Sequence, residues 1–208
     1  TLGVAPYTDE KLQENFRLDS FFVGVSTRNS VNRGGADYTP VFLSEVPDLF
    51  RSELIPVDVA LIQTSLPDKH GYLSLGISVD VVESAVEMAE LVVAQVNMPR
   101  THGDGFINIK DIDFLLPHDK PLLEYSVKAP CHIVQSIGRY VARIIEDGST
   151  IQVGYGLIPD PVVPNLLDKK DLGVHTELLS DGIVNLMKKG VVTNRKKTHN
   201  PGKTIASF

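Results

Sequence analysis

The sequence has a single cysteine and lacks several patterns that would define a class of function. Cys131 cannot form an internal disulfide, which fits a reducing compartment, and we expect the cytoplasm. Although His132 follows it, side chains adjacent in sequence do not face each other on a helix, so we interpret Cys131 as a small buried thiol. No apolar run is long enough to span a membrane, and we expect no membrane association.

Metal-binding and nucleic-acid-binding patterns are also missing. The histidines form no i, i+4 pair and no HExxH motif, so we expect no metal site. Basic and aromatic residues are not interleaved, which argues against a nucleic-acid partner. Residues 1–120 carry 18 acidic and 9 basic side chains, whereas residues 121–208 carry 8 acidic and 11 basic. The basic balance of the second part suits either a polyanionic ligand or an ordinary solvated surface.

The hydrophobic pattern of the first part predicts an α/β fold. The 208 residues are 42% hydrophobic and 22% charged, which is typical of a globular protein. The order of elements predicts parallel βαβ units. Continuous apolar runs predict buried strands at Phe21–Val25, Val57–Thr64 and Leu91–Val96. Helical spacing predicts helices over Val41–Leu54 and over a stripe of Val81, Val82, Ala85, Val86 and Ala89.

Prolines between Pro117 and Pro130 interrupt this rhythm and predict a domain junction. We therefore expect one domain over residues 1–120 and a second over residues 121–208. In the second, apolar spacing predicts a helix over 133–145 ended at Gly148, and a helix over 183–189 that Ser180 caps and Gly190 ends. We interpret 28–38 and the basic run 195–197 as solvated loops, with anion binding as the alternative.

The most informative stretch begins with a predicted strand over 150–153. A glycine turn, Gly154-Tyr155-Gly156, follows it, and Glu177 comes at the end of a second strand. Open α/β sheets bind ligands at the carboxyl ends of their strands. Glu177 could therefore be a nucleophile that faces an oxyanion hole of backbone N–H groups. The spacing also fits a turn that is purely structural.

A dinucleotide-binding fold is a further reading of the same stretch, because it also places an acidic residue about 20 residues after a glycine turn. Here Pro159 stands where that motif has its third glycine. Proline removes an N–H and prevents the usual close packing of helix on strand, so the nicotinamide reading is less favoured. A second candidate loop, with Arg100, Thr101 and His102, follows the strand ending at Val96, where a site loop and a structural loop are equally compatible with the composition.

Several stretches together resemble the acetyl-CoA hydrolase/transferase family, and within it the branch of the 4-hydroxybutyrate or butyrate:acetate CoA-transferases. They follow the order of the family over nearly the whole chain. The stretches are Ala36–Pro40, Leu43–Pro47, Gln95–Asp104, Asp147–Gln152, Gly154–Pro159, and Gly173–Glu177 with Ser180–Gly182.

The resemblance implies two open, mostly parallel α/β domains of the CoA-transferase (NagB/RpiA-like) type, both incomplete in this chain, with the active site between them. It makes Glu177 the nucleophile and places oxyanion donors at Gln152, Val153, Gly154 and Gly156. It implies an acyl-CoA thioester and short-chain carboxylates as substrates, no bound cofactor, and a homodimer. It also implies that this chain is a central piece of a longer protein, inactive alone because a glycine-rich loop is missing.

The family mechanism is transfer of CoA through a glutamyl-CoA thioester, with acetate, butyrate or 4-hydroxybutyrate as the acid. Covalent catalysis of this kind gives ping-pong kinetics. Hydrolysis of the same thioester by water is an alternative within the family. A non-catalytic nucleotide-binding domain is the alternative from a different class.

Overall fold

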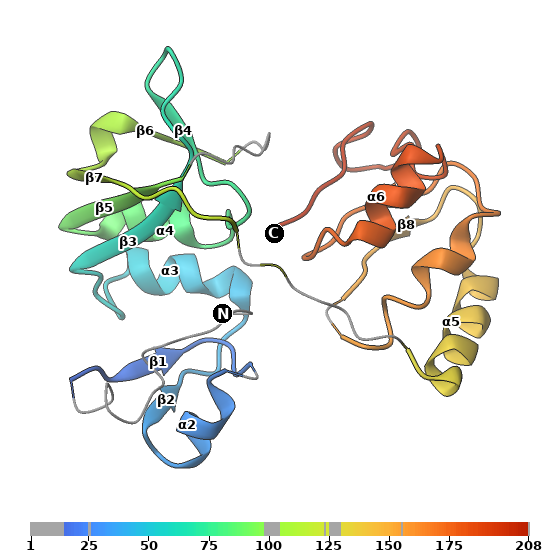
Figure 1. The fold of residues 1–208 in the computed structure, drawn as a ribbon, viewed down its shortest axis with the longest axis horizontal. Coiled ribbons are helices and arrows are strands. Elements are labelled where there is room, and N and C mark those ends of the chain that lie inside the picture. Colours follow the sequence, from blue (N-terminus) through green and yellow to red (C-terminus); the bar gives the residue numbers. More distant parts are fainter. Residues whose placement is uncertain are drawn as a thin grey trace. The chain divides into compact units, whose positions relative to one another are not determined.

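The computed structural model of the chain defines residues 15–24, 26–97, 105–122, 124, 130–154 and 156–207 (Figure 1). The chain divides into two units, Thr1–Tyr125 and Ser126–Phe208. The described elements from β1 to β7 belong to the first unit, and those from α5 to α6 belong to the second.

A three-stranded parallel sheet forms the centre of the first unit, which confirms the predicted parallel arrangement, although its third strand was not predicted. Its strands lie side by side in the order β3 (Val59–Thr64), β5 (Leu91–Val96) and β7 (Phe114–Pro117). Helix α4 (Val82–Met88) connects β3 to β5, which completes a βαβ unit. The core between sheet and helix consists of Ala60, Ile62, Leu75, Val86, Val92, Ala94 and Ile107.

The prediction that β3 is buried like the strands of a two-sided sheet was wrong. Ala60 and Ile62 are buried, but Val59 and Leu61, which alternate with them, are 48% and 78% exposed. Side chains of a strand point alternately to its two faces, and α4 covers the face that carries Ala60. A run of apolar residues does not reveal how many faces its neighbours cover.

The predicted strand Phe21–Val25 was also wrong over its described residues. The strand in this region is β1 (Leu18–Ser20), which pairs in parallel with β2 (Ala36–Tyr38). The chain bends at Phe21, whose ring packs edge-on against Phe50 with centroids 6.0 Å apart. The aromatic side chain is thus used in packing against a helix and not in a sheet.

The remaining elements of the first unit are short. The helix predicted over 41–54 is confirmed as a 3-10 turn, η2 (Leu43–Glu45), that leads into α3 (Val46–Arg51). The expected loop over 28–38 instead contains α2 (Arg28–Asn32) and strand β2. An antiparallel pair joins β4 (Tyr72–Ser74) to β6 (Phe106–Asn108), and η3 (Ile109–Asp111) follows.

The second unit surrounds a short parallel ladder. Its core consists of Ala142, Val153, Val163, Leu166, Leu172, Val174, Ile183, Leu186, Val191 and Val192. Both predicted helices are confirmed, and Gly190 has a φ of 74° just after the second one, as a helix end requires. The elements are α5 (His132–Ile144), β8 (Thr150–Ile151), η4 (Val163–Leu166), β9 (Gly173–Val174) and α6 (Asp181–Lys188).

Four local predictions in the second unit were wrong. Ser180 lies at the N-cap of α6, but its hydroxyl forms no capping hydrogen bond with a described residue. Cys131 is exposed, not buried, because it precedes α5 as the residue at its N-cap. Helix α5 ends at Ile144, so Gly148 shapes a separate turn, in which its N–H donates to the Lys170 carbonyl. Lys197 of the supposedly solvated basic run is only 5% exposed.

Candidate active site

Strands β8 and β9 end side by side at the predicted site. Their parallel register pairs Ile151 with Val174, and the His175 N–H donates to the Ile151 carbonyl at 3.1 Å. After this bond, the side chain of Thr176 takes over the hydrogen bonding between the two segments. The Thr176 hydroxyl accepts from the Val153 N–H at 3.0 Å and donates to the Val153 carbonyl at 2.8 Å. One hydroxyl thus satisfies both backbone groups of Val153.

A third segment, residues 205–207, forms hydrogen bonds with the side of residues 175–177 that faces away from β8. Ile205 bridges His175 in parallel, and the Thr176 N–H donates to the Ile205 carbonyl at 2.9 Å. The Ser207 N–H donates to the Glu177 carbonyl at 3.0 Å. The peptides that lead into Glu177 therefore have hydrogen bonds on both sides.

Glu177 lies just beyond β9, at the carboxyl end of the ladder, and its side chain is half-buried. Its carboxylate forms no hydrogen bond or ion pair with any described residue. This arrangement combines a fixed backbone with a carboxylate that no described side chain neutralises. It suits attack on an electrophilic carbon, because the nucleophile is oriented without being tied to a partner.

The glycine turn differs from the prediction at Val153, whose N–H is not a free donor because Thr176 accepts from it. Gly154 is different. A Cβ at this position would meet no atom of the described residues within 4 Å, and the φ of Gly154 lies outside the left-handed range. Neither packing nor backbone conformation explains this glycine, so the open space suits the approach of a ligand to the backbone. Gly156 has a φ of 144°, which favours glycine. Tyr155 lies outside the described residues.

Two buried polar side chains form hydrogen bonds with the backbone of β9. Asn194, in the left-handed conformation, accepts from the Val174 N–H at 2.9 Å and donates to the Thr204 hydroxyl at 2.8 Å. The Lys197 ammonium donates to the carbonyls of Val174 at 2.8 Å and Lys203 at 2.7 Å. Burial lowers the pKa of the Lys197 amino group from its usual range.

Sequence reasoning missed these supporting residues. A signal for Thr176 exists: it alternates with His175 after a buried strand, so a polar, β-branched side chain is turned inward and needs a partner. For Lys197 the basic run gave the opposite indication. Its burial depends on carbonyls of residues that are distant in sequence, such as Val174.

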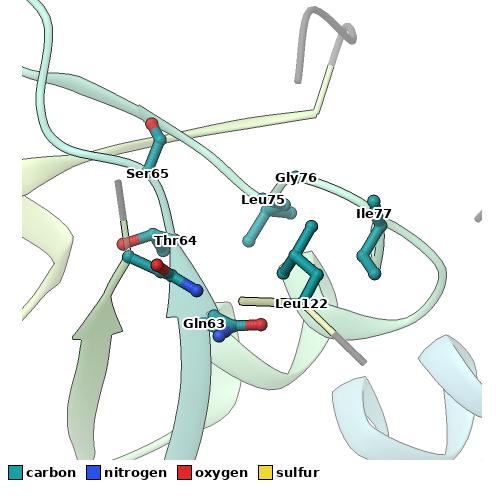
Figure 2. Close-up of a pocket in the computed structure, with 8 residues that line it drawn as sticks. Gln63, Thr64, Ser65, Leu75, Gly76, Ile77 and Leu122 are labelled. Carbon is teal, nitrogen blue, oxygen red and sulfur yellow. The ribbon is translucent and has the colours of Figure 1, made fainter. Parts of the chain in front are cut away.

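The second predicted site loop, Arg100, Thr101 and His102, lies outside the described residues. At the carboxyl ends of β3 and β5, the first unit has an open pocket (Figure 2). The Thr64 hydroxyl in its lining is buried and has no hydrogen-bond partner among the described residues. The pocket is open to solvent, and we assign no ligand to it. The lining is Gln63, Thr64, Ser65, Leu75, Gly76, Ile77, Asn97 and Leu122.

Two further features are absent from the part of the chain that the structure describes. Among the residues that the structure describes, no group of three or more histidine, cysteine or acidic side chains is arranged to hold a metal ion. None of the helices in the described ranges has both the length and the apolar character that a membrane crossing needs.

Comparison with known proteins decides the family. Residues 1–124 match the acetyl-CoA hydrolase/transferase N-terminal domain. The whole chain is 50% identical to a 4-hydroxybutyrate coenzyme A transferase of Clostridium kluyveri. The chain belongs to the acetyl-CoA hydrolase/transferase family. This confirms the resemblance drawn from the motifs, and relatives of this family are named as transferases.

Two further relatives show how far the similarity extends. A succinyl-CoA:acetate/propanoyl-CoA:succinate CoA transferase of Fasciola hepatica is 43% identical over 98% of the chain. The crystal structure of RipA from Yersinia pestis superposes with a TM-score of 0.89 at 32% identity, over 97% of this chain and 49% of that one. The fold prediction is thereby confirmed as that of a CoA-transferase family member. The chain spans about half the length of the relatives, 49% for the Clostridium protein and 43% for the Fasciola protein.

Proposed function

We propose that the protein containing this chain is a CoA-transferase that moves CoA between an acyl-CoA and a short-chain carboxylic acid, with Glu177 as its nucleophile. Membership of the family supports the reaction class. The observation that carries the residue assignment is the carboxylate of Glu177, unpaired among the described residues, at the end of a strand whose backbone is bonded on both sides.

The proposed reaction proceeds by exchange at two carbonyl carbons. A carboxylate oxygen of Glu177 attacks the thioester carbonyl, the C–S bond breaks, and an acyl-glutamyl anhydride and CoA thiolate form. The thiolate attacks the glutamyl carbonyl, which releases the first carboxylate and leaves a glutamyl-CoA thioester. An acceptor carboxylate then repeats these steps in reverse and leaves as the new acyl-CoA. No metal and no redox step is needed for this balance.

Each addition places negative charge on a carbonyl oxygen, and the proposal includes backbone N–H groups that donate hydrogen bonds to that oxygen. Gly154 suits the role best, because the space over its Cα is open and no hydrogen bond of its N–H is recorded in the described chain. Gln152 and Gly156 stay predicted contributors. An oxyanion could use the Val153 N–H only by sharing it with, or displacing, the Thr176 hydroxyl. Loss of one such donor typically costs about 3 kcal/mol of transition-state stabilisation.

The finer assignments belong to the same proposal. Acetate, butyrate or 4-hydroxybutyrate is the acid, and the enzyme is a cytoplasmic homodimer. Residues 121–208 form the start of the domain that carries the nucleophile, and residues 1–120 belong to the first domain. The loop with Arg100, Thr101 and His102 contributes to the substrate site.

The test uses the complete gene product, with the sequence that flanks these residues. The enzyme is incubated with acetyl-CoA and then reduced with borohydride, which converts a glutamyl thioester to the alcohol, and the modified peptide is identified by mass spectrometry. We expect the label on Glu177, parallel lines in two-substrate kinetics with 4-hydroxybutyrate, and at least about a 10³-fold loss of kcat in Glu177→Gln.

The matched control is Glu146→Gln, which removes an exposed carboxylate of the same unit and should leave kcat unchanged. Label on another residue, or an active Glu177→Gln enzyme, would refute the assignment of the nucleophile. Release of free CoA without formation of 4-hydroxybutyryl-CoA would instead identify the enzyme as a hydrolase.

A further inference from the structure

Thr176 occupies an unusual place in the ladder that leads to Glu177. The parallel pairing of β8 with β9 ends after the bond from His175 to Ile151. The next backbone groups of the first strand, the N–H and carbonyl of Val153, face the hydroxyl of Thr176 and not a backbone. The side chain of Thr176 thus takes the place of a neighbouring strand at the point where the two segments separate.

The hydroxyl is well placed to fix this separation. Thr176 is 5% exposed and Val153 is 7% exposed, so water does not compete freely for the two bonds. The Thr176 backbone is itself bound to Ile205, and the Glu177 carbonyl is bound to Ser207. Thr176 therefore links the segment before Gly154 to the segment that carries Glu177, and the latter is anchored on its far side.

The chemical requirements of this link are narrow. One atom has to accept a hydrogen bond and donate another, at 3.0 and 2.8 Å from two atoms of a single residue. Among residues of similar size, only threonine and serine have a hydroxyl at this position. Valine has nearly the shape of threonine but would leave the buried N–H and carbonyl of Val153 without partners.

We infer that Thr176 is a positioning residue for the reaction: its hydroxyl sets the distance between the Glu177 carboxylate and the backbone at Val153 and Gly154. This inference rests on the proposed function, in which Glu177 attacks the thioester and the glycine turn stabilises the oxyanion. A displacement of about 1 Å between a nucleophile and its supporting groups can cost about 10²-fold in rate. A purely structural hydroxyl would change stability but not the rate of the folded enzyme.

The experiment compares Thr176→Val and Thr176→Ser in the complete gene product, with acetyl-CoA and 4-hydroxybutyrate as substrates. We expect Thr176→Val to lower kcat by about 10- to 100-fold, with each KM changed by less than about 3-fold. The rate at which borohydride-reducible Glu177 accumulates should fall in parallel. Thr176→Ser should keep at least about a third of kcat, because it retains the hydroxyl.

Thr193→Val is the matched control. It removes a threonine hydroxyl from the same unit, one that donates to Asp171 at 2.9 Å and that has no hydrogen bond to Val153 or Glu177 in the described chain. We expect this variant to lose thermal stability without losing kcat. If Thr176→Val does not fold, Thr176→Cys replaces it, because a thiol fills the site but is a weak donor and acceptor.

Two outcomes would overturn the inference. One is a kcat for folded Thr176→Val within about 3-fold of the wild-type value, or above it, which would mean that the hydroxyl only stabilises the fold or competes for the Val153 N–H. The other is a fall in Thr176→Ser equal to that in Thr176→Val. Failure of the proposed function is distinguishable from both, because Glu177→Gln would then remain active.

Discussion

Replacement of Gly138 by alanine tests how closely α5 packs on the segment that follows the glycine turn. Gly138 is buried in the middle of α5. A Cβ at this position would lie 2.7 Å from the Pro161 carbonyl carbon, 3.1 Å from the Val162 nitrogen, and closer still to the Pro161 carbonyl oxygen. These neighbours are backbone atoms, so they cannot move away by a side-chain rotation.

Two opposing terms set the magnitude of the effect. Alanine is favoured over glycine inside a helix by about 1 kcal/mol. Overpacking of a filled interior costs about 1–3 kcal/mol, and a clash with backbone belongs at the upper end of that range. The net expectation is that Gly138→Ala lowers the free energy of opening of α5 by about 2 kcal/mol, even though it improves helix propensity.

Native-state hydrogen exchange of the α5 amides in the complete gene product measures this free energy. A loss of about 2 kcal/mol corresponds to a fall of about 30-fold in protection. Gly182→Ala in α6 is the control, because its Cβ would meet Val163 Cγ1 at 2.9 Å, a side-chain atom that can rotate away. We expect Gly182→Ala to change the hydrogen-exchange protection of the α6 amides by less than about 10-fold. Equal or higher protection in Gly138→Ala would refute the close contact of α5 with residues 161 and 162.

Two further substitutions follow from the site. Gly154→Ala should fold normally, because the added Cβ meets no atom of the described residues within 4 Å. If substrate approaches this backbone, kcat/KM should nevertheless fall by about 10-fold or more. Enzyme assays and thermal unfolding together test this, and an unchanged kcat/KM would remove Gly154 from the site. Lys197→Met should lower the free energy of unfolding by about 2 kcal/mol, because two carbonyls lose a charged donor. Burial lowers the pKa of Lys197 below its usual 10.5, so at pH values between the lowered pKa and 10.5 the unfolded chain binds more protons than the folded one. The free energy of unfolding of the wild type should therefore rise with pH over that window. Urea titrations at several pH values test this, and the same rise in Lys197→Met would contradict it.

The candidate site was predictable in part. The position of Glu177 after a strand, and of the glycine turn after its neighbour, follows from local patterns because each requires only a few adjacent residues. The engagement of the Val153 N–H was not predictable, since it depends on a hydroxyl 23 residues away. The same holds for Asn194 and Lys197, whose partners on β9 are also distant in sequence.

The sequence by itself determined the elements whose periodicity is long, namely α5, α6 and the strands β3 and β5, together with the family. A helix or strand of this length repeats its pattern often enough for one sequence to define it. Only the tertiary structure decided which faces and groups are covered: β3 is buried on one face, Cys131 is exposed, Lys197 is buried, and Thr176 completes the ladder beside Glu177. Burial and pairing depend on which residues pack against a side chain, and these residues are distant in the sequence, so the local pattern does not reveal them.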